Sequence, residues 1–124
     1  MADQIPLRGQ IAIDGGAPHV HAVRRLRASF PQVEWIDGPR VDTPTIRLRT
    51  SDNLAEGAFA IAVEPNDGSP AVTVRGGPFS GVIYGVEEIV QRLAKPIEGG
   101  FDLPVGTCAD APDLAHRTWW NWDH

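Results

Sequence analysis

Residues 71–93, AVTVRGGPFSGVIYGVEEIVQRL, decide the fold. The stretch begins with alternation, in which Val72 and Val74 share one face, and this predicts a strand over residues 71–75. After Gly76-Gly77-Pro78 the apolar side chains recur at helical spacing, as Phe79, Val82, Ile83, Val86, Ile89, Val90 and Leu93. A strand that leads directly into an amphipathic helix predicts an α/β domain with the helix packed on the sheet.

Glycines are unusually frequent in this helix. Gly77, Gly81 and Gly85 lie four apart and share one side. A glycine inside a helix costs about 1 kcal/mol relative to alanine, so we expect a close approach of the helix backbone to the sheet. Glu88 and Arg92 are also four apart, and we expect them as a pair on the solvent side.

Upstream of this unit the sequence predicts two more strands. Residues 58–64 alternate and join residues 71–75 through the turn signal at 66–68, which indicates a hairpin. Residues 45–50 alternate with Ile46 and Leu48 on the inner face. The opposite face, predicted to remain for solvent or a partner, carries Arg47, Arg49 and Arg75.

The N-terminal third predicts a strand–helix–strand unit. Residues 10–13 form the first strand, residues 19–29 the helix, and residues 33–36 a second strand with Trp35 toward the core. We expect these two strands to be parallel, with a right-handed crossover. The order β-α-β-β-β-β-α predicts a two-layer α/β (α+β) sandwich, with a mixed sheet of about five strands and both helices on one face.

The C-terminal part predicts little regular structure. Residues 97–112 are expected as loop, with a short extended piece at 103–105. Residues 109–124, ADAPDLAHRTWWNWDH, contain three of the four tryptophans beside arginine and carboxylates, a composition typical of a ligand-contacting segment. We therefore divide the chain into a domain, 1–108, and a linker, 109–124, that leads into an absent domain.

Composition limits the classes of function. The formal net charge is −5, which argues against nucleic acid as a partner. The arginines at 24, 25 and 27 are expected to form a solvated helix face. A single cysteine, Cys108, excludes an internal disulfide and Cys-x-x-Cys zinc spacing. No membrane span or signal peptide is visible, so we expect no membrane association and a cytoplasmic location.

Motif spacing predicts no catalytic centre, cofactor or metal in these residues. Gly76 and Gly81 have the first spacing of a phosphate-binding loop, but Val82 and Ile83 stand where that loop needs Lys and Ser or Thr. His19 and His21 diverge on a helix and make no metal pair. The chain alone is therefore expected to be catalytically empty.

Two segments resemble a known group of domains. Residues 81–86, GVIYGV, look like the Gly-(apolar)-(apolar)-Tyr-Gly-(apolar) helix of the accessory domain that precedes the catalytic barrel in glycoside hydrolases. The barrel enzymes in question are family 20 β-N-acetylhexosaminidases and family 67 α-glucuronidases. Residues 111–117 are similar to their Ala-Pro-x-(apolar)-x-x-Arg stretch, and Trp122-Asp123 is similar to a Trp-Asp pair of the α-glucuronidases. Trp120 and Asn121 depart from that pattern.

The resemblance implies a zincin-like domain without a metal or catalytic centre of its own. Its partner would be a downstream catalytic domain of the same polypeptide, which it would support through hydrophobic contacts. By position, Arg117, Trp122 and Asp123 would contact the sugar substrate. Tryptophan stacks on the apolar face of a sugar, and an arginine fork holds hydroxyls or a carboxylate.

Three alternatives stay open. The tryptophans of the tail could pack on this domain or begin a buried barrel strand. The chain could be a stand-alone carbohydrate-binding module that uses the tail and the arginine-bearing sheet face. It could also be an interaction domain whose tail marks the interface with an unrelated partner.

Overall fold

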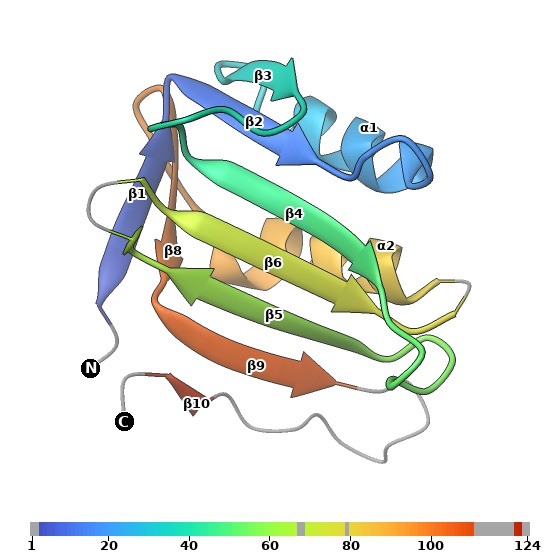
Figure 1. Ribbon diagram of the computed structural model, residues 1–124. Coiled ribbons are helices and arrows are strands. Elements are labelled where there is room, and N and C mark those ends of the chain that lie inside the picture. Colours follow the sequence, from blue (N-terminus) through green and yellow to red (C-terminus); the bar gives the residue numbers. More distant parts are fainter. Residues whose placement is uncertain (1–2, 67–68, 79, 111–120, 123–124) are drawn as a thin grey trace.

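The computed structural model describes residues 3–66, 69–78, 80–110 and 121–122, and it has two layers (Figure 1). One layer is a seven-stranded sheet with the order β10-β9-β5-β6-β4-β2-β3. The other layer holds the helices, which lie behind this sheet in Figure 1. The strands are β2 (Gln10–Asp14), β3 (Glu34–Asp37), β4 (Thr45–Thr50), β5 (Phe59–Glu64), β6 (Ala71–Gly76), β9 (Gly106–Asp110) and β10 (Asn121–Trp122).

The sheet is mixed. Strands β3, β2, β4 and β6 are parallel neighbours, whereas β5 runs antiparallel to both β6 and β9. Alternation puts Ile46, Leu48, Val72 and Val74 on the helix-covered face, where all four are buried. The predicted α+β sandwich, with parallel strands in the first unit, is confirmed, but the main sheet has seven strands and not about five, because β9 and β10 extend it beyond β5.

Two helices cover one face of the sheet. Helix α1 (Val20–Ser29) connects β2 to β3, and helix α2 (Gly81–Glu88) follows β6. Helix α2 continues into a π-helical turn, η2 (Ile89–Leu93). It packs on β4, β5 and β6 and also contacts α1.

A second, three-stranded sheet closes one end of the helix layer. It has the order β1-β8-β7, with β1 (Gln4–Arg8), β8 (Gly100–Pro104) and β7 (Lys95–Ile97). Leu7, Phe101 and Leu103 are fully buried in the core that both sheets share. The ring of Phe101 stacks on Phe30, just after α1, with 4.1 Å between the ring centroids.

The glycines bring α2 close to the sheet. A Cβ atom at Gly85 would lie 2.6 Å from Cγ1 of Val74, and one at Gly81 would lie 2.5 Å from the carbonyl oxygen of Ala58. Neither distance is tolerable for a real side chain. The close approach predicted from the glycine spacing is therefore confirmed for these two positions.

The position of Glu88 corrects a prediction. Glu88 is only 3 % exposed, whereas the sequence predicted that both Glu88 and Arg92 would lie on the solvent side. Residues three and four apart share a helix face, so the glycine row that faces the sheet continues from Gly85 to Glu88. Arg92 does lie at the surface, and its Nε atom stands 3.8 Å from Oε2 of Glu88.

The predicted loop at residues 97–112 is wrong over most of its length, because β8 and β9 occupy residues 100–104 and 106–110. Strand β1 was not predicted either. These strands are short, and their pairing is with distant parts of the chain, β1 with β8 and β9 with β5. The local periodicity of a sequence does not show which distant strands will pair.

Candidate functional site

The tail was predicted to carry the sugar-contacting residues. Arg117 and Asp123 lie outside the described residues. Trp122 belongs to β10, which pairs antiparallel with β9 so that Trp122 is opposite Gly106 and Asn121 is opposite Thr107. The end of the described chain therefore returns to the β9 edge of the main sheet.

The division of the chain at residue 108 stays a prediction. Strand β9 runs on through Ala109 to Asp110, and these residues pair with Ala60 and Phe59 of β5. The first residues of the predicted linker thus belong to the sheet of the preceding domain.

The sheet face opposite the helices, called the open face below, carries three arginines. They are Arg47 and Arg49 of β4 and Arg75 of β6, as the alternation predicted. Arg49 and Arg75 stand in register, an arrangement of like charges that is unfavourable by itself. Asp14 relieves it, because its Oδ2 atom lies 2.7 Å from Nη2 of Arg49.

Arg49 is further engaged with the backbone. Its Nη1 donates to the carbonyl oxygens of Asp14, at 3.2 Å, and Leu48, at 3.0 Å. This guanidinium joins the ends of β2 and β4 and acts as a structural group. Of the three arginines, Arg75 is exposed and Arg47 is half-buried.

Small side chains are common on the rest of the open face. The outward residues of β5, β6 and β9 include Ala60, Ala62, Thr73, Thr107 and Ala109, and Glu64 at the end of β5 is an exposed charged residue on the same face. Alanine is uncommon in strands, where larger β-branched residues are favoured. A level surface of this kind allows another protein layer to approach the sheet closely.

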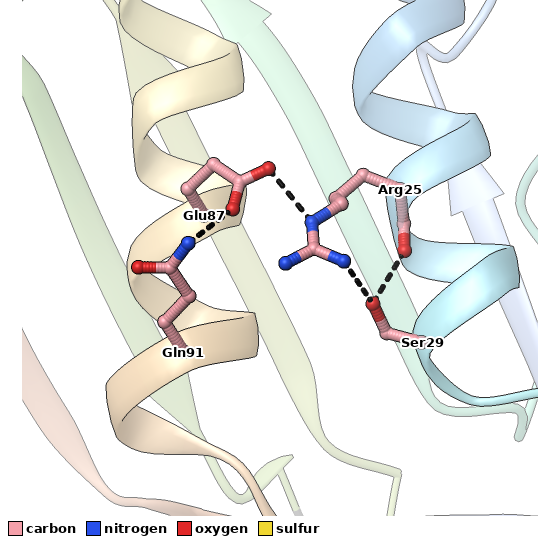
Figure 2. A network of polar contacts seen from close by, with 4 residues as sticks. All are labelled: Arg25, Ser29, Glu87 and Gln91. Atoms are coloured by element: carbon pink, nitrogen blue, oxygen red, sulfur yellow. Dashed lines mark hydrogen bonds and ion pairs between the residues drawn. The ribbon is translucent and has the colours of Figure 1, made fainter.

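The outer surface of the helix layer holds a polar network that joins α1 to α2 (Figure 2). Nε of Arg25 donates to Oε2 of Glu87 at 2.8 Å, and Nε2 of Gln91 donates to the other carboxylate oxygen at 2.8 Å. Ser29 accepts from Nη1 of Arg25 at 3.3 Å and donates to the Arg25 carbonyl at 2.7 Å. Both ion-pair partners are about one-third exposed, so the network positions the helices at a modest energetic gain.

His19 is partly buried at the residue preceding α1, and its side chain makes no capping hydrogen bond. Burial disfavours the charged imidazolium and lowers the pKa of His19 below its ordinary 6.5. Within the described part of the chain, no three His, Cys, Asp or Glu side chains gather as a metal site. The described helices include none long and apolar enough to cross a membrane.

Comparison with known proteins identifies the fold. No protein-family model matches the chain, and no curated protein matches its sequence. Solved structures do match. The β-N-acetylhexosaminidase from Bacteroides fragilis has a TM-score of 0.61 at 18% identity, and the match covers 86% of this chain and 21% of that one.

Two further structures give the same result. The GH20 exo-β-N-acetylglucosaminidase from Vibrio harveyi matches with a TM-score of 0.59 at 14% identity, over 91% of this chain and 17% of that chain. The GH20 β-N-acetylhexosaminidase from Streptomyces coelicolor matches with a TM-score of 0.60 at 17% identity, over 92% of this chain and 25% of that chain. The chain thus shares the fold of a part of these enzymes and spans a quarter of their length or less.

Proposed function

We propose that this chain is an accessory domain of a glycoside hydrolase of the β-N-acetylhexosaminidase type, and that it supports a catalytic barrel without performing the reaction itself. The observation that carries the proposal is the match in fold. Between 86% and 92% of this chain corresponds to only 17–25% of three such enzymes. A domain that occupies so small a part of an enzyme leaves most of that enzyme to the catalytic machinery.

The surface of the domain is compatible with this role. Its two sheets share one core with the helices, so it offers a rigid body to a neighbour. The small residues of the open face let a second layer approach closely, and β10 ends the described chain at the β9 edge. A catalytic domain that followed the tail would adjoin this edge.

In this proposal the tail contributes to the sugar site at the domain junction. Arg117 would hold hydroxyls or a carboxylate, Trp122 would stack on a sugar ring, and Asp123 would accept hydrogen bonds from hydroxyls. These contacts need acidic catalytic residues from the neighbouring domain.

The proposal also covers which type of glycoside hydrolase the domain belongs to. The zincin-like character of the domain and the α-glucuronidase alternative come from the sequence resemblance alone. The matched structures are β-N-acetylhexosaminidases, so we place an N-acetyl-β-hexosaminide ahead of an α-glucuronide as the substrate.

Activity assays test the proposal directly. The chain alone and the polypeptide encoded by its natural reading frame are compared on 4-nitrophenyl N-acetyl-β-glucosaminide and on an α-glucuronide. We expect hydrolysis of the hexosaminide by the longer protein and none by the chain alone. Turnover by the chain alone, or a reading frame without a barrel-length domain, would overturn the proposal.

A stand-alone carbohydrate-binding module is the second candidate. The open face favours it, because Arg47 has Thr73 and Arg75 has Ala60 as a small cross-strand neighbour, which leaves room for a sugar acid on that side. Calorimetry of the chain with uronic acids and oligosaccharides separates the two candidates. Binding at about 1 mM or tighter that is lost in Trp122→Ala would favour the module.

A further inference from the structure

A groove lies at the corner where β2, α1 and β3 meet. Its volume is about 540 Å³, within the range of small-molecule sites. It is found at the carboxyl ends of β2 and β3, which is where open α/β sheets commonly bind ligands. The strand order places it at the β3 edge of the sheet, opposite the β9–β10 edge. Its lining includes Ile13, Gly16, Ala17, Val20, Val23 and Gly38.

The floor of this corner groove is aliphatic. Ile13 is buried beneath it, and Val20 on the wall is 50 % exposed although it is a large apolar side chain. Exposed valine beside a concave surface indicates apolar area that a ligand can cover.

Two glycines keep the corner groove open. A Cβ atom at Gly16 would lie 2.9 Å from Cγ2 of Val23 and 3.1 Å from Cγ2 of Ile13, so any side chain there would crowd the floor. At Gly38 a Cβ atom would meet nothing within 4 Å, and its φ of +82° strongly favours glycine. The side of the groove at Gly38 is therefore free space.

The rim is cationic in a chain whose net charge is negative. Two guanidinium groups, of Arg24 and Arg27, face one carboxylate, that of Asp37. Nη2 of Arg27 stands 3.2 Å from Oδ1 of Asp37, and the Asp37 side chain is 90% exposed, so this pair is weak and exchangeable. Arg24 has no hydrogen bond or ion pair with the described residues, which leaves its planar fork available.

We infer that the corner groove binds a small organic carboxylate with an aliphatic body. The aliphatic part covers Val20 and Val23, and the carboxylate accepts hydrogen bonds from Arg24. Arg27 can exchange Asp37 for the same anion. This ligand site is separate from the proposed support of a catalytic domain, and it does not depend on that proposal.

Titration of the 124-residue chain with hexanoate, followed by amide NMR, tests the inference. We expect saturable shifts at Gly15, Gly16, Gly38 and along α1, with a Kd of about 1 mM or tighter for a ligand of this size. Three probes separate the contributions of charge and chain. Hexanol lacks the charge, acetate lacks the aliphatic chain, and hexylammonium reverses the charge, so each should bind at least about fivefold more weakly.

Variants locate the contact. Arg24→Gln should weaken hexanoate to the level of hexanol while leaving hexanol binding unchanged, and Ala17→Leu should weaken both by filling the groove. Arg8→Gln, at the end of β1 and away from the groove, is the matched control and should change neither. Equal affinity for hexanoate and hexanol, shifts that map elsewhere, or an Arg24→Gln variant with unaltered hexanoate affinity would each overturn the inference.

Discussion

Helices α1 and α2 lie on the same face of the same sheet and touch each other, but they differ in how many of their residues are buried. Helix α2 lies over β4, β5 and β6, and five of its eight residues are buried. Helix α1 lies toward the β2–β3 edge, with only Ala22 and Leu26 buried. Val20, Val23, Arg24 and Arg27 of α1 line the corner groove, and its Arg25 and Ser29 belong to the polar network.

The two helices therefore have different roles in this small domain. Helix α2 contributes mainly to stability, and helix α1 presents side chains at the surface. The central helix has little freedom to vary at Gly81 and Gly85, because glycine is needed where its backbone meets the sheet. The edge helix is fixed by a few apolar contacts and leaves its arginines for interactions with solvent or ligand. Substitutions in the two helices should therefore differ in cost, and the following variants test that contrast.

The largest effect is expected in α2. Gly81→Ala should destabilise the domain by about 4 kcal/mol, because the added Cβ would press on backbone atoms of Ala58 and Gly76 that cannot rotate away. Urea denaturation followed by tryptophan fluorescence measures this. The matched control in α1, Ala28→Gly at an exposed position, should cost about 1 kcal/mol. If Gly81→Ala were stabilising, as helix propensity alone would have it, the close approach of α2 would be refuted.

A smaller loss is expected at the anchor of α1. Leu26→Ala should cost about 3 kcal/mol, because Leu26 is fully buried and its removal leaves a cavity. The same urea experiment applies, with Leu26→Met as the volume-conserving control at less than about 1.5 kcal/mol. A cost below about 1 kcal/mol would show that α1 can repack at the sheet edge.

The contact between the two helices should contribute less still. A double-mutant cycle of Arg25→Ala and Glu87→Ala should give a coupling energy of about 0.5 kcal/mol, which falls as salt screens the pair. Thermal unfolding at low and high salt measures it. A coupling above about 2 kcal/mol would mean that the pair is much less hydrated than its one-third exposure indicates.

The smallest effect concerns pH. Burial lowers the pKa of His19, so the unfolded chain binds more protons than the folded one in the interval between the folded pKa and 6.5. Stability should therefore be complete above about pH 6.5 and should fall as the pH is lowered through that interval. His19→Gln should flatten this part of the pH profile. An identical slope in the wild type and His19→Gln would contradict the assignment.

Local sequence patterns predicted much of this fold. Residues 45–50 alternate strictly and form β4 with the predicted bounds, and residues 81–93 keep their helical stripe. The pattern failed where strands find partners far away, as in β1 and β8. It also failed at Glu88, because a charged residue was assumed to face water although its spacing from Gly85 places it against the sheet.

The candidate sites were harder to predict from the sequence than the fold was. Arg117, Trp122 and Asp123 were chosen through resemblance, and their role stays a proposal. The corner groove was missed because the arginines at 24, 25 and 27 were interpreted together as a solvated face. Arg24 and Arg27 are three apart and share one side, whereas Arg25 turns to α2. The spacing of Arg24 and Arg27, together with Gly15-Gly16 before the helix, is the sequence signal that could have indicated the groove.

The pairing of β1 with β8 has a consequence for synthesis. Residues 4–8 are synthesised well before their partner strand, which ends at Pro104. Until that strand has emerged, Leu7 has no Phe101 or Leu103 to pack with, and the nascent core stays unclosed along one side. Long sequence separation of this kind slows folding and prolongs exposure of apolar surface. This side of the core therefore closes only after β8 has been synthesised and has paired with β1.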